Sequence, residues 1–574
     1  MTVYFAWVDL VDGAAPAFSA AHHVQDEDIF AFTVTHSEGD FPQLSLEVKN
    51  EGNGLLAPGR KRWGWLSRDT GAGAEPLFFG RLVGTPEDVD SETQRLLLIA
   101  RSKNWAAQKE ALADTLRVLP FFDPVWLGEN VRNDPDMVLQ ARSALWHTDR
   151  ITNALTVSDY VTGEVGPVEL NHFRDGLQYR FATAAARQIK VTADALWAQQ
   201  GQGVIDISAS LLKAFTAAGS KYAGLISTYT GEGLIRSWPE VGTRIGSGWS
   251  VGPIELTRVD GSLVKREYLE IRTDDGGAGR FPVWEIQPSM KVEYETSRSY
   301  GERVSFTLKS DIQPLVVGED DDEPLELNLS TSAVGEPIDG VLPIGDLRRR
   351  SYFQTDRGAQ SLSHLLQRAR AALRAEARAV EIVVDVPFAE AAALSCRHSA
   401  TVTDPRLPGG TATGKVTEYS FGIDGETGRA FGVVSLGCTI GTGAELDVPA
   451  GDPVYVADDY ANGWQADTVA VADEGDTAWQ WGAEREVNDD GVDLFQLSEA
   501  SAVLSVTVEN GVTGQRAAMD RAFEDIAEAA SQMNAVPTLV TLQMLPIDGT
   551  GFSTEYDITT FNLVLPKTID LEAA

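Results

Sequence analysis

Gly80-Arg81-Leu82-Val83, followed by Glu92-Thr93-Gln94-Arg95, is the stretch that decides the fold, because a later stretch repeats it. The later one is Gly414-Lys415-Val416, followed by Glu426-Thr427-Gly428-Arg429, and every matching residue lies 334 positions further along the chain. Hairpin turns generally recruit Gly, Asp, Glu and Thr, so chance is one explanation of the match. The other explanation is that the chain contains two copies of one domain.

Each stretch has the pattern of a β-hairpin. A glycine and a basic residue open an apolar strand, a polar turn follows, and a second apolar strand leaves from the arginine. The turns are Asp90–Thr93 and Asp424–Thr427, and the second strands are 96–99 and 431–436. A further strand-like run precedes each hairpin, at 43–48 and 380–386. If the two copies are real, Arg95 and Arg429 occupy equivalent corners of two domains.

Composition narrows the class of protein. A chain of 574 residues with 43% hydrophobic and 8% aromatic residues can bury several cores, and this length is typical of roughly three to five domains. The net charge of −37 argues against an ordinary nucleic-acid binder, because phosphate recognition needs clustered cations. It does not argue against a surface that nucleic acid passes without adhering. Cys396 and Cys438 are the only cysteines, so we expect buried free thiols and no stabilising disulfide.

The N-terminus and the hydropathy pattern predict a protein made in the cytoplasm without stable membrane insertion. Residues 1–9 are apolar but lack a basic region, and Asp9 and Asp12 interrupt the apolar run that a signal peptide needs. We expect a first β-strand there. No uncharged apolar stretch approaches the roughly 20 residues of a membrane helix.

The predicted fold class is mainly β (α+β), with two similar β-barrel domains in one chain and connecting helices. Strand patterns cover 30–35, 62–66 and 77–80. A helix N-capped by Ser102 ends before Pro120, and the clearest helix spans 361–379. Further helical patterns lie near 174–186, 207–217 and 513–531.

These patterns divide the chain into four parts. Residues 1–125 form the first barrel domain with its trailing helix, and 126–345 form the middle β-rich part. Residues 346–445 contain the basic helix and the second barrel domain, and 446–574 form an acidic C-terminal β-rich domain with one helix. The acidic run at 318–324 is expected to be a loop or linker.

Charge is distributed unevenly in the last two parts. Residues 346–380 contain eight arginines and three acidic residues, with Arg370, Arg374 and Arg378 recurring every fourth position on one helix face. Such a face either covers carboxylates of its own chain or contacts an acidic neighbouring subunit. Residues 441–574 contain 4 basic and 25 acidic residues, a net charge of −21. A surface this acidic repels polyanions.

Two catalytic or metal-binding patterns are present but incomplete. Gly248-Trp249-Ser250-Val251-Gly252 matches the GxSxG motif of hydrolases, which needs a helix after the serine. Pro253 and a strand-like run follow Ser250 instead, so we do not expect a nucleophile there. His22, His23 and Asp26 lack the additional ligands of a recognisable metal motif, and a surface loop is the better interpretation. We predict no catalytic, cofactor or metal site.

The best enzyme candidate lies in the acidic part. Glu484, Glu486, Asp489 and Asp490 follow Trp479 and Trp481, and glycosidases place two carboxylates across a sugar, often beside aromatic side chains. Acidic residues are abundant throughout this part, however, and tryptophans at alternate positions of a strand more often belong to a core. A polysaccharide hydrolase, or a carbohydrate- or receptor-binding tail-tip protein, therefore remains the alternative function.

Several stretches resemble the tail hub proteins of tailed bacteriophages and gene transfer agents. Residues 36–50, His36-Ser37-Glu38-Gly39-Asp40-Phe41-Pro42 and onward, together with Leu77–Gly84, resemble the first β-barrel of that family. Asp404-Pro405-Arg406-Leu407-Pro408-Gly409-Gly410, with Gly414-Lys415-Val416, resembles the second barrel. The resemblance covers about residues 25–125 and 360–441, with no catalytic residue to test.

The resemblance implies a structural role at the tip of a virion tail. In that family the hub is a homotrimer whose paired barrels form a ring of six, adapting the six-fold tail tube to a three-fold tip around the DNA channel. The implied partners are the distal tail or tail tube protein, the tape measure protein and a central spike or fibre. Genomic DNA would pass without specific binding. The chain is expected to be a non-enzymatic baseplate component that contributes to DNA ejection and is assembled in the host cytoplasm.

Overall fold

The computed structural model describes most of residues 2–572. The ranges that it leaves out are 9–16, 26, 51–62, 84–87, 91, 129, 182–184, 207–248, 273–277, 314–323, 335–341, 344–350, 444–478, 489–503, 511–537 and 545–551. The helical patterns near 207–217 and 513–531 and the acidic run at 318–324 lie largely or wholly outside the described residues.

The fold is mainly β, as predicted, and its largest unit is a sheet of 13 strands. The first β domain contributes β1–β7, in the spatial order β1-β4-β5-β7-β3-β2. Their bounds are β1 (Val3–Val8), β2 (Ile29–Ser37), β3 (Gln43–Lys49), β4 (Trp63–Asp69), β5 (Ala74–Leu82), β6 (Asp88–Val89) and β7 (Thr93–Ile99). The short β6 pairs with β7 beyond the point where β5 leaves it, so β6 continues the path of β5.

The second β domain completes the same sheet in the order β10-β18-β19-β20-β17-β11. Its strands are β10 (Val165–Glu169), β11 (Leu177–Phe181), β17 (Val380–Val386), β18 (His398–Thr403), β19 (Thr411–Ile423) and β20 (Ala430–Cys438). The short helix α4 (Phe388–Ala393) lies between β17 and β18. The strand pairing therefore adds residues 165–181 to the second domain, although its predicted range began at 346.

The two β domains have the same topology. When the six principal strands of each are numbered in chain order, with β6 counted as part of the fifth, both sheets have the order 1-4-5-6-3-2. All neighbours in the first domain are antiparallel. The second domain differs only at its first strand, where β10 pairs with β18 in parallel. Six strands have many possible orders, so the shared order supports two copies of one domain.

In neither β domain do the described strands form a closed barrel, in contrast to the predicted barrels. In the first domain β1 and β2, at the two ends of the path, nevertheless contact each other. Both domains contribute to one hydrophobic core, which includes Leu46, Leu96, Val384 and Val434.

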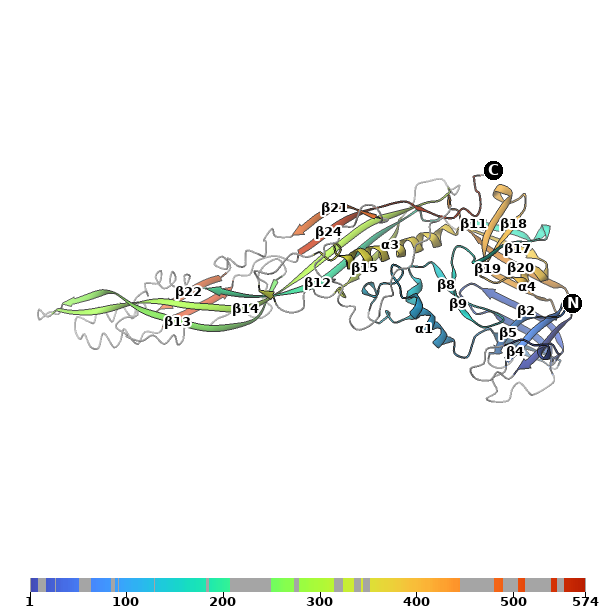
Figure 1. Cartoon of the computed structure of the whole chain (residues 1–574), viewed down its shortest axis with the longest axis horizontal. Helices are drawn as coiled ribbons and strands as arrows, with labels where there is room; N and C mark the ends of the chain where they lie inside the picture. Colours follow the sequence, from blue (N-terminus) through green and yellow to red (C-terminus); the bar gives the residue numbers. More distant parts are fainter. Residues whose placement is uncertain are drawn as a thin grey trace.

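A long insertion separates the second and third strands of the second β domain. β12 (Gln188–Asp206), β13 (Trp249–Arg272) and β14 (Ala278–Asp311) form antiparallel pairs that extend far from the two β domains (Figure 1). The same sheet includes β15 (Leu325–Thr331), β16 (Leu342–Pro343), β21 (Trp479–Asn488), β24 (Phe552–Thr560) and β25 (Leu563–Val564). Two further two-stranded antiparallel sheets, β8–β9 (Ala144–Thr148, Leu155–Asp159) and β22–β23 (Leu504–Asn510, Thr538–Met544), lie outside the two large sheets.

Two predicted helices are present, with corrected starting points. Helix α3 (Asp356–Ala377) begins at the N-cap Thr355, whose hydroxyl accepts a hydrogen bond from the Gly358 N–H. Helix α1 (Trp105–Leu116) begins after Asn104, whereas Ser102, the predicted cap, bonds to the Gln108 side chain. Among the described helices, none is long and apolar enough to cross a membrane.

The helical prediction near 174–186 is wrong. Within the described residues of that range, helical structure is limited to a single 3-10 turn at Arg174–Gly176, and Leu177–Phe181 is strand β11. The alternation of Leu177, Tyr179 and Phe181 with polar residues is the period of a strand. Pairing with β17 decides between the two conformations.

The repeated motif occupies equivalent places in the two hairpins. A Cβ at Gly80 would lie 2.6 Å from the Ile99 carbonyl oxygen, and one at Gly414 would lie 2.9 Å from the Gly437 carbonyl oxygen. Ile99 and Gly437 are the residues paired with Arg81 and Lys415. Each motif glycine is therefore needed because the return strand passes too close for a side chain.

The turns are equivalent as well, but the arginines are not. Asp90 accepts hydrogen bonds from the N–H groups of the second and third residues after it, and Asp424 does the same. The Asp90 N–H then bonds to the Thr93 carbonyl, whereas the Asp424 N–H bonds to that of Arg429. Thr93 thus corresponds to Arg429, and the predicted equivalence of Arg95 with Arg429 is wrong because the second turn is two residues longer.

Candidate assembly surface

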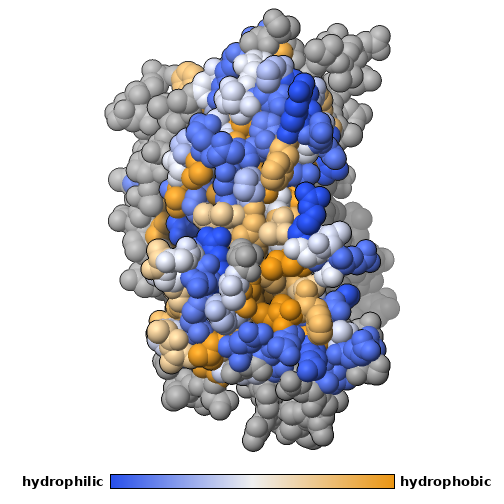
Figure 2. All heavy atoms as spheres, turned by 90° about the vertical axis from the view of Figure 1, so that its right-hand side faces the viewer, coloured by the Kyte–Doolittle hydropathy of each residue, from blue (hydrophilic) through white to orange (hydrophobic). Residues whose placement is uncertain are grey.

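The candidate assembly surface is the end of the molecule that is formed by the two β domains. Figure 1 places both termini at this end, opposite the long β13–β14 hairpin. Seen from that end, apolar side chains reach the surface near the middle of the face, with hydrophilic residues around them (Figure 2). The contact between the two β domains within the chain indicates which kind of partner this end of the molecule can bind.

The two domains are joined by an antiparallel pairing of β2 with β19. Six residue pairs run from Ser37 opposite Glu418 to Phe32 opposite Ile423. Immediately beyond them, the Glu38 N–H donates to the Thr417 carbonyl. This places the second strand of one domain against the fifth strand of the other.

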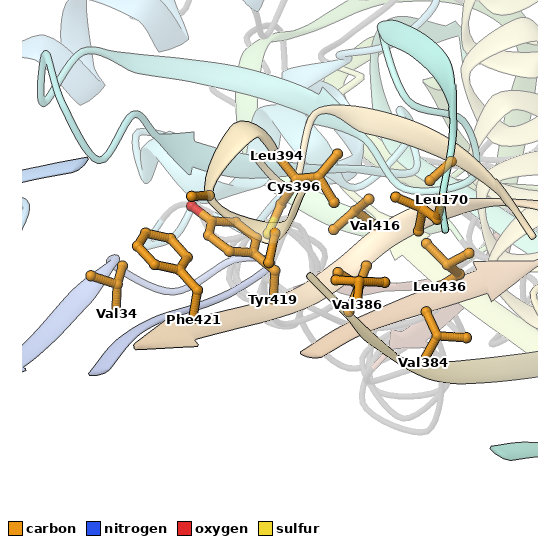
Figure 3. Packing of buried hydrophobic residues seen from close by; sticks show 14 of the residues in the cluster. Val34, Leu170, Val384, Val386, Leu394, Cys396, Val416, Tyr419, Phe421 and Leu436 are labelled. Atoms are coloured by element: carbon orange, nitrogen blue, oxygen red, sulfur yellow. The ribbon is translucent and has the colours of Figure 1, made fainter. Parts of the chain in front are cut away.

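Side chains on one face of this joint form a continuous core. Phe32, Val34 and His36 of β2 are 1%, 0% and 1% exposed. Figure 3 shows Val34 beside Phe421, with Tyr419 next along β19, and these two rings are stacked with centroids 6.2 Å apart. Burial of these side chains makes the joint a stable part of the fold.

Arg150, in the turn between β8 and β9, connects the two β domains through hydrogen bonds. Its guanidinium donates to the Leu77 carbonyl at 3.0 Å, to the Tyr419 hydroxyl at 2.9 Å and to the carbonyls of Ala392 and Leu394. The last two carbonyls terminate α4 and lack partners within that helix. The 7% exposed Arg150 thus satisfies acceptors from both domains.

Two buried histidines lie beside this arginine. The Nδ1 atom of His36 is 3.2 Å from the Tyr419 hydroxyl, and the ring centroid of His147 is 5.1 Å from that of His36. Burial, reinforced by the charges of His147 and Arg150, lowers the pKa of His36 to about 3. Burial also lowers the pKa of His147 to about 4. Both rings are therefore neutral near pH 7.

Lys415, the basic residue of the second motif, is part of the same joint. Its ammonium group donates to the Ser158 hydroxyl at 2.9 Å and lies 3.7 Å from Glu38, which also pairs with Arg378. The Lys415 side chain is fully buried, and burial lowers its pKa. Glu38 follows β2 directly, so this cluster adds an electrostatic contact between the domains.

The arginine face of α3 binds its own chain. Arg374 lies 3.1 Å from Asp159, and the Arg378 guanidinium carbon lies 3.6 Å from the centre of the Tyr160 ring. Near the start of the helix, Arg357 pairs with the fully buried Asp123 at 2.5 Å. Of the two interpretations of this face, coverage of neighbouring carboxylates within the chain is the one that the described contacts support.

The structure does not bring together the described candidates for catalysis and metal binding. Ser250 lies within β13 opposite Ser297, and the strand continues to Arg272, as the sequence after the serine predicted. The His23 Nδ1 atom bonds to the Ser67 hydroxyl at 2.7 Å, and His22 bonds to Ser19. Asp26 lies outside the described residues, among which no cluster of three metal-ligating side chains occurs.

The glycosidase candidates lie on and after one strand. Glu484 and Glu486 are in β21, opposite Tyr556 and Thr554 of β24. Trp479 and Trp481 belong to the same strand, which has an irregular register after Trp481. Only the backbone of β21 is described, and Asp489 and Asp490 lie outside the described residues.

The residues that hold the joint were not singled out from the sequence. His147 lies in the five-residue strand β8 and Arg150 in the turn that follows it, and so short a strand and turn leave no clear periodic signal in the sequence. Lys415 belonged to the motif, but its contact with Glu38 depends on the pairing of segments almost 380 residues apart. The two cysteines are buried free thiols, as expected.

Comparison with known proteins finds similarity only at the level of solved structures. No family model matches the chain, and no curated protein does. The prophage MuSo2 43 kDa tail protein from Shewanella oneidensis aligns with 11% identity and a TM-score of 0.32, covering 76% of this chain and 97% of that one. The tail protein from Neisseria meningitidis MC58 aligns with 7% identity and a TM-score of 0.34, covering 76% and 96%.

A prophage tail protein from Listeria monocytogenes EGD-e aligns with 8% identity and a TM-score of 0.27, covering 72% of this chain and 89% of the other. These names describe those proteins. For this chain, the strand order that the two β domains share is a stronger observation than these three alignments.

Proposed function

We propose that the chain is a structural tail hub protein of a bacteriophage-like particle and assembles as a homotrimer. The observation that carries this proposal is the duplicated domain with the strand order 1-4-5-6-3-2. Three chains with two such domains each supply six similar units, which suits an adaptor to a six-fold tail tube.

The difference between the two domains supports three-fold symmetry on the other side. Only the second domain has the long insertion between its second and third strands, with β12, β13 and β14. A ring of six domains would therefore present three such insertions. A three-fold tail tip, with a central spike or fibre, is the kind of partner that matches this number.

The remaining partners in the proposal are the distal tail or tail tube protein and the tape measure protein. Genomic DNA would pass through the ring, and the net charge of −37 opposes adhesion of a polyanion to its wall. The protein would be assembled in the host cytoplasm and located at the tail tip. It would have no catalytic role of its own.

The oligomeric state tests this proposal most directly. Sedimentation equilibrium of the purified full-length chain should give three times the chain mass of 62.0 kDa. A three-dimensional reconstruction should show three-fold density in which two domains of each chain superpose. A monomer at all soluble concentrations would contradict the trimer.

The alternative functions have their own readouts. Clearing of host envelope polysaccharide in a zymogram would favour a hydrolase that uses Glu484, Glu486 or the neighbouring acids. Glycan binding that disappears on deletion of residues 450–574 would favour a carbohydrate-binding module. The hub proposal expects neither result.

A further inference from the structure

Residues 563–572 form an extended segment that contacts two different parts of the molecule, and we call this segment the latch. Its first two residues form β25, which pairs in parallel with residues 310–311 at the end of β14. Its later residues form single β-bridges with residues 412, 440 and 443 of the second β domain. The latch therefore lies between the second β domain and the sheet that contains β12, β13 and β14. We call that sheet, together with helix α3 packed on it, the arm.

The apolar side chains of the latch are divided between two hydrophobic cores. Leu563 and Leu565 are 7% and 0% exposed, and both belong to the core of the arm. Ile569 is 2% exposed and belongs to the core that the two β domains share, against which Leu571 also packs. Burial of these side chains stabilises the latch at both of its ends. One short segment thus connects the two cores.

Gln313 lies where the arm, the second β domain and the latch meet. It follows β14 and is 2% exposed. Its side-chain amide donates to the Gly441 carbonyl at 3.0 Å and to the Ile569 carbonyl at 2.8 Å, and it accepts from the Leu571 N–H at 2.8 Å. The Gln313 N–H donates to the Ile440 carbonyl at 2.8 Å. One residue of the arm is therefore bonded to both the second β domain and the latch.

Gly441 is the position where the latch crosses closest to the second β domain. Its N–H donates to the Pro566 carbonyl at 3.0 Å, and a Cβ atom at residue 441 would collide with the carbonyl group of Leu565. At Gly443, two residues further along, a Cβ atom would lie 3.3 Å from a methyl group of Val564. The latch backbone can lie this close only because residue 441 has no side chain.

The contacts of the latch with the second β domain are few and isolated. The Thr439 N–H donates to the Thr568 hydroxyl at 2.6 Å, and the Thr568 N–H donates to the Thr439 carbonyl at 3.1 Å. The remaining backbone contacts are single bridges and not a continuous ladder. The two cores, in contrast, consist mainly of residues from long strands and from α3. Segments held by isolated contacts open at a lower free energy than the strands beside them.

We propose that the latch fixes the direction of the arm relative to the second β domain and that it opens while both cores stay folded. When the latch opens, Gln313 loses its bonds to Ile569 and Leu571. The arm then remains connected through residues 378–379, which link α3 to β17, and through the ion pair of Arg374 with Asp159. This short link becomes the pivot of the arm. The inference concerns a single chain and goes beyond the proposed function.

Hydrogen exchange of the unmodified full-length chain tests whether the latch opens by itself. The N–H groups of Lys567, Thr568 and Leu571 all donate in latch contacts. After correction for intrinsic rates, they should exchange at least about tenfold faster than the N–H groups in the middle of α3 and β20. Equal protection of the latch, α3 and β20 would mean that the latch opens only by global unfolding, and would overturn the inference.

Two matched glycine variants test the crossing point. Neither Gly441 nor Gly443 has a positive φ, so the backbone accepts alanine at both positions. Gly441→Ala should displace the latch and raise the exchange of its N–H groups by a further factor of about ten, with α3 and β17 unchanged. Gly443→Ala should raise it less than about twofold, because its Cβ meets only a methyl group. Faster exchange in α3 and β17 as well would show that the latch and the cores open together, which contradicts the proposal.

Spin labels measure the direction of the arm. Leu196→Cys in β12 is 45% exposed in the native chain, and Glu426→Cys lies in the exposed turn before β20. The native Cys396 and Cys438 are buried, and burial raises the pKa of both thiols, so the labels attach to the introduced cysteines.

The distance between the two labels is measured by pulsed electron paramagnetic resonance, with unlabelled chain in excess so that only distances within one chain are recorded. The distance distribution should be about twice as wide with Gly441→Ala as with Gly443→Ala, because the open latch frees the arm. Equal widths would show that other contacts fix the arm and would overturn the inference. Neither result depends on whether the chain is a trimer by sedimentation, so the tail hub proposal is tested separately.

Discussion

The first and second β domains share one topology but differ in what covers their second strands. In the first domain β2 is buried beneath β19, and Val34 is fully buried. In the second domain β11 lies at the edge of the sheet. Tyr179 of β11 occupies the position of Val34. Val34 lies opposite Leu44, which lies opposite Leu98, and Tyr179 lies opposite Ile382, which lies opposite Leu436. Leu98 and Leu436 each lie opposite the residue that follows the basic residue of the repeated motif. Tyr179 is 42% exposed. The comparison teaches that duplication preserved the strand order, whereas the neighbour of each strand determined which side chains became core.

The two domains also differ at the connection that follows this strand. In the first domain five residues, 38–42, connect β2 to β3, whereas in the second domain residues 182–379 separate β11 from β17. A loop on the rim of a sheet tolerates such an insertion because the closure entropy grows slowly with length. The insertion therefore changes the outline of the molecule without changing the order of the strands.

The largest difference between the domains should appear when one charge is placed at equivalent positions. Val34→Asp buries an unpaired carboxylate and should lower the free energy of unfolding by roughly 4 kcal/mol or more. Tyr179→Asp should cost about 1 kcal/mol or less, because water reaches that position. Urea denaturation of dilute protein measures both. Similar losses would contradict the assigned difference in burial.

Removal of the arginine that joins the domains should have the next largest effect. Arg150→Met leaves carbonyl acceptors of Leu77, Ala392 and Leu394 without a donor, and we expect a loss of about 3–5 kcal/mol. Arg303→Met removes a 48% exposed partner of Asp194 and should cost no more than about 1 kcal/mol. If both variants unfold at the same urea concentration, Arg150 does not hold the joint.

A smaller effect should appear in the dependence of stability on pH. The pKa of His36 is about 3 in the folded chain, below the value of roughly 6.5 in the unfolded chain. Between these two values the unfolded state binds a proton that the folded state excludes, so stability falls as pH falls. The expected contribution is about 1.4 kcal/mol per pH unit.

The His36→Phe variant tests that contribution, because it keeps an aromatic ring at this position and removes the titrating group. Its free energy of unfolding should decline less steeply between pH 6.5 and 4.5 than that of the original chain. Tyr419→Phe removes the same hydrogen bond without removing the titrating group, and should lower stability without changing the slope. An unchanged slope in His36→Phe would refute the assignment.

The smallest effects should come from the two turn aspartates. Asp90→Ala and Asp424→Ala each remove an acceptor for two backbone N–H groups. We expect small and similar decreases in Tm, with most of the loss recovered by Asp→Asn, which keeps the acceptor. A marked difference between the two decreases would show that the turns contribute differently to the domains.

The strands and their duplication could be predicted from local patterns. Alternating apolar residues identified β3 and β17, and turn chemistry identified the hairpins around Asp90 and Asp424, because both signals depend on residues close in sequence. The helical prediction for 174–186 failed because local preference there is weak and pairing with β17 outweighs it. The hairpin offset of 334 was correct up to the turn and failed beyond it.

The sequence by itself determined a mainly β chain, two hairpins of one kind, the α3 helix and a strongly acidic composition, because these follow from residue type and short-range periodicity. The tertiary structure alone decided that residues 165–181 join the second domain, that Arg150 connects both domains, and that Val34 is buried where Tyr179 is exposed. Those facts depend on contacts between segments hundreds of residues apart, whose pairing no local pattern encodes.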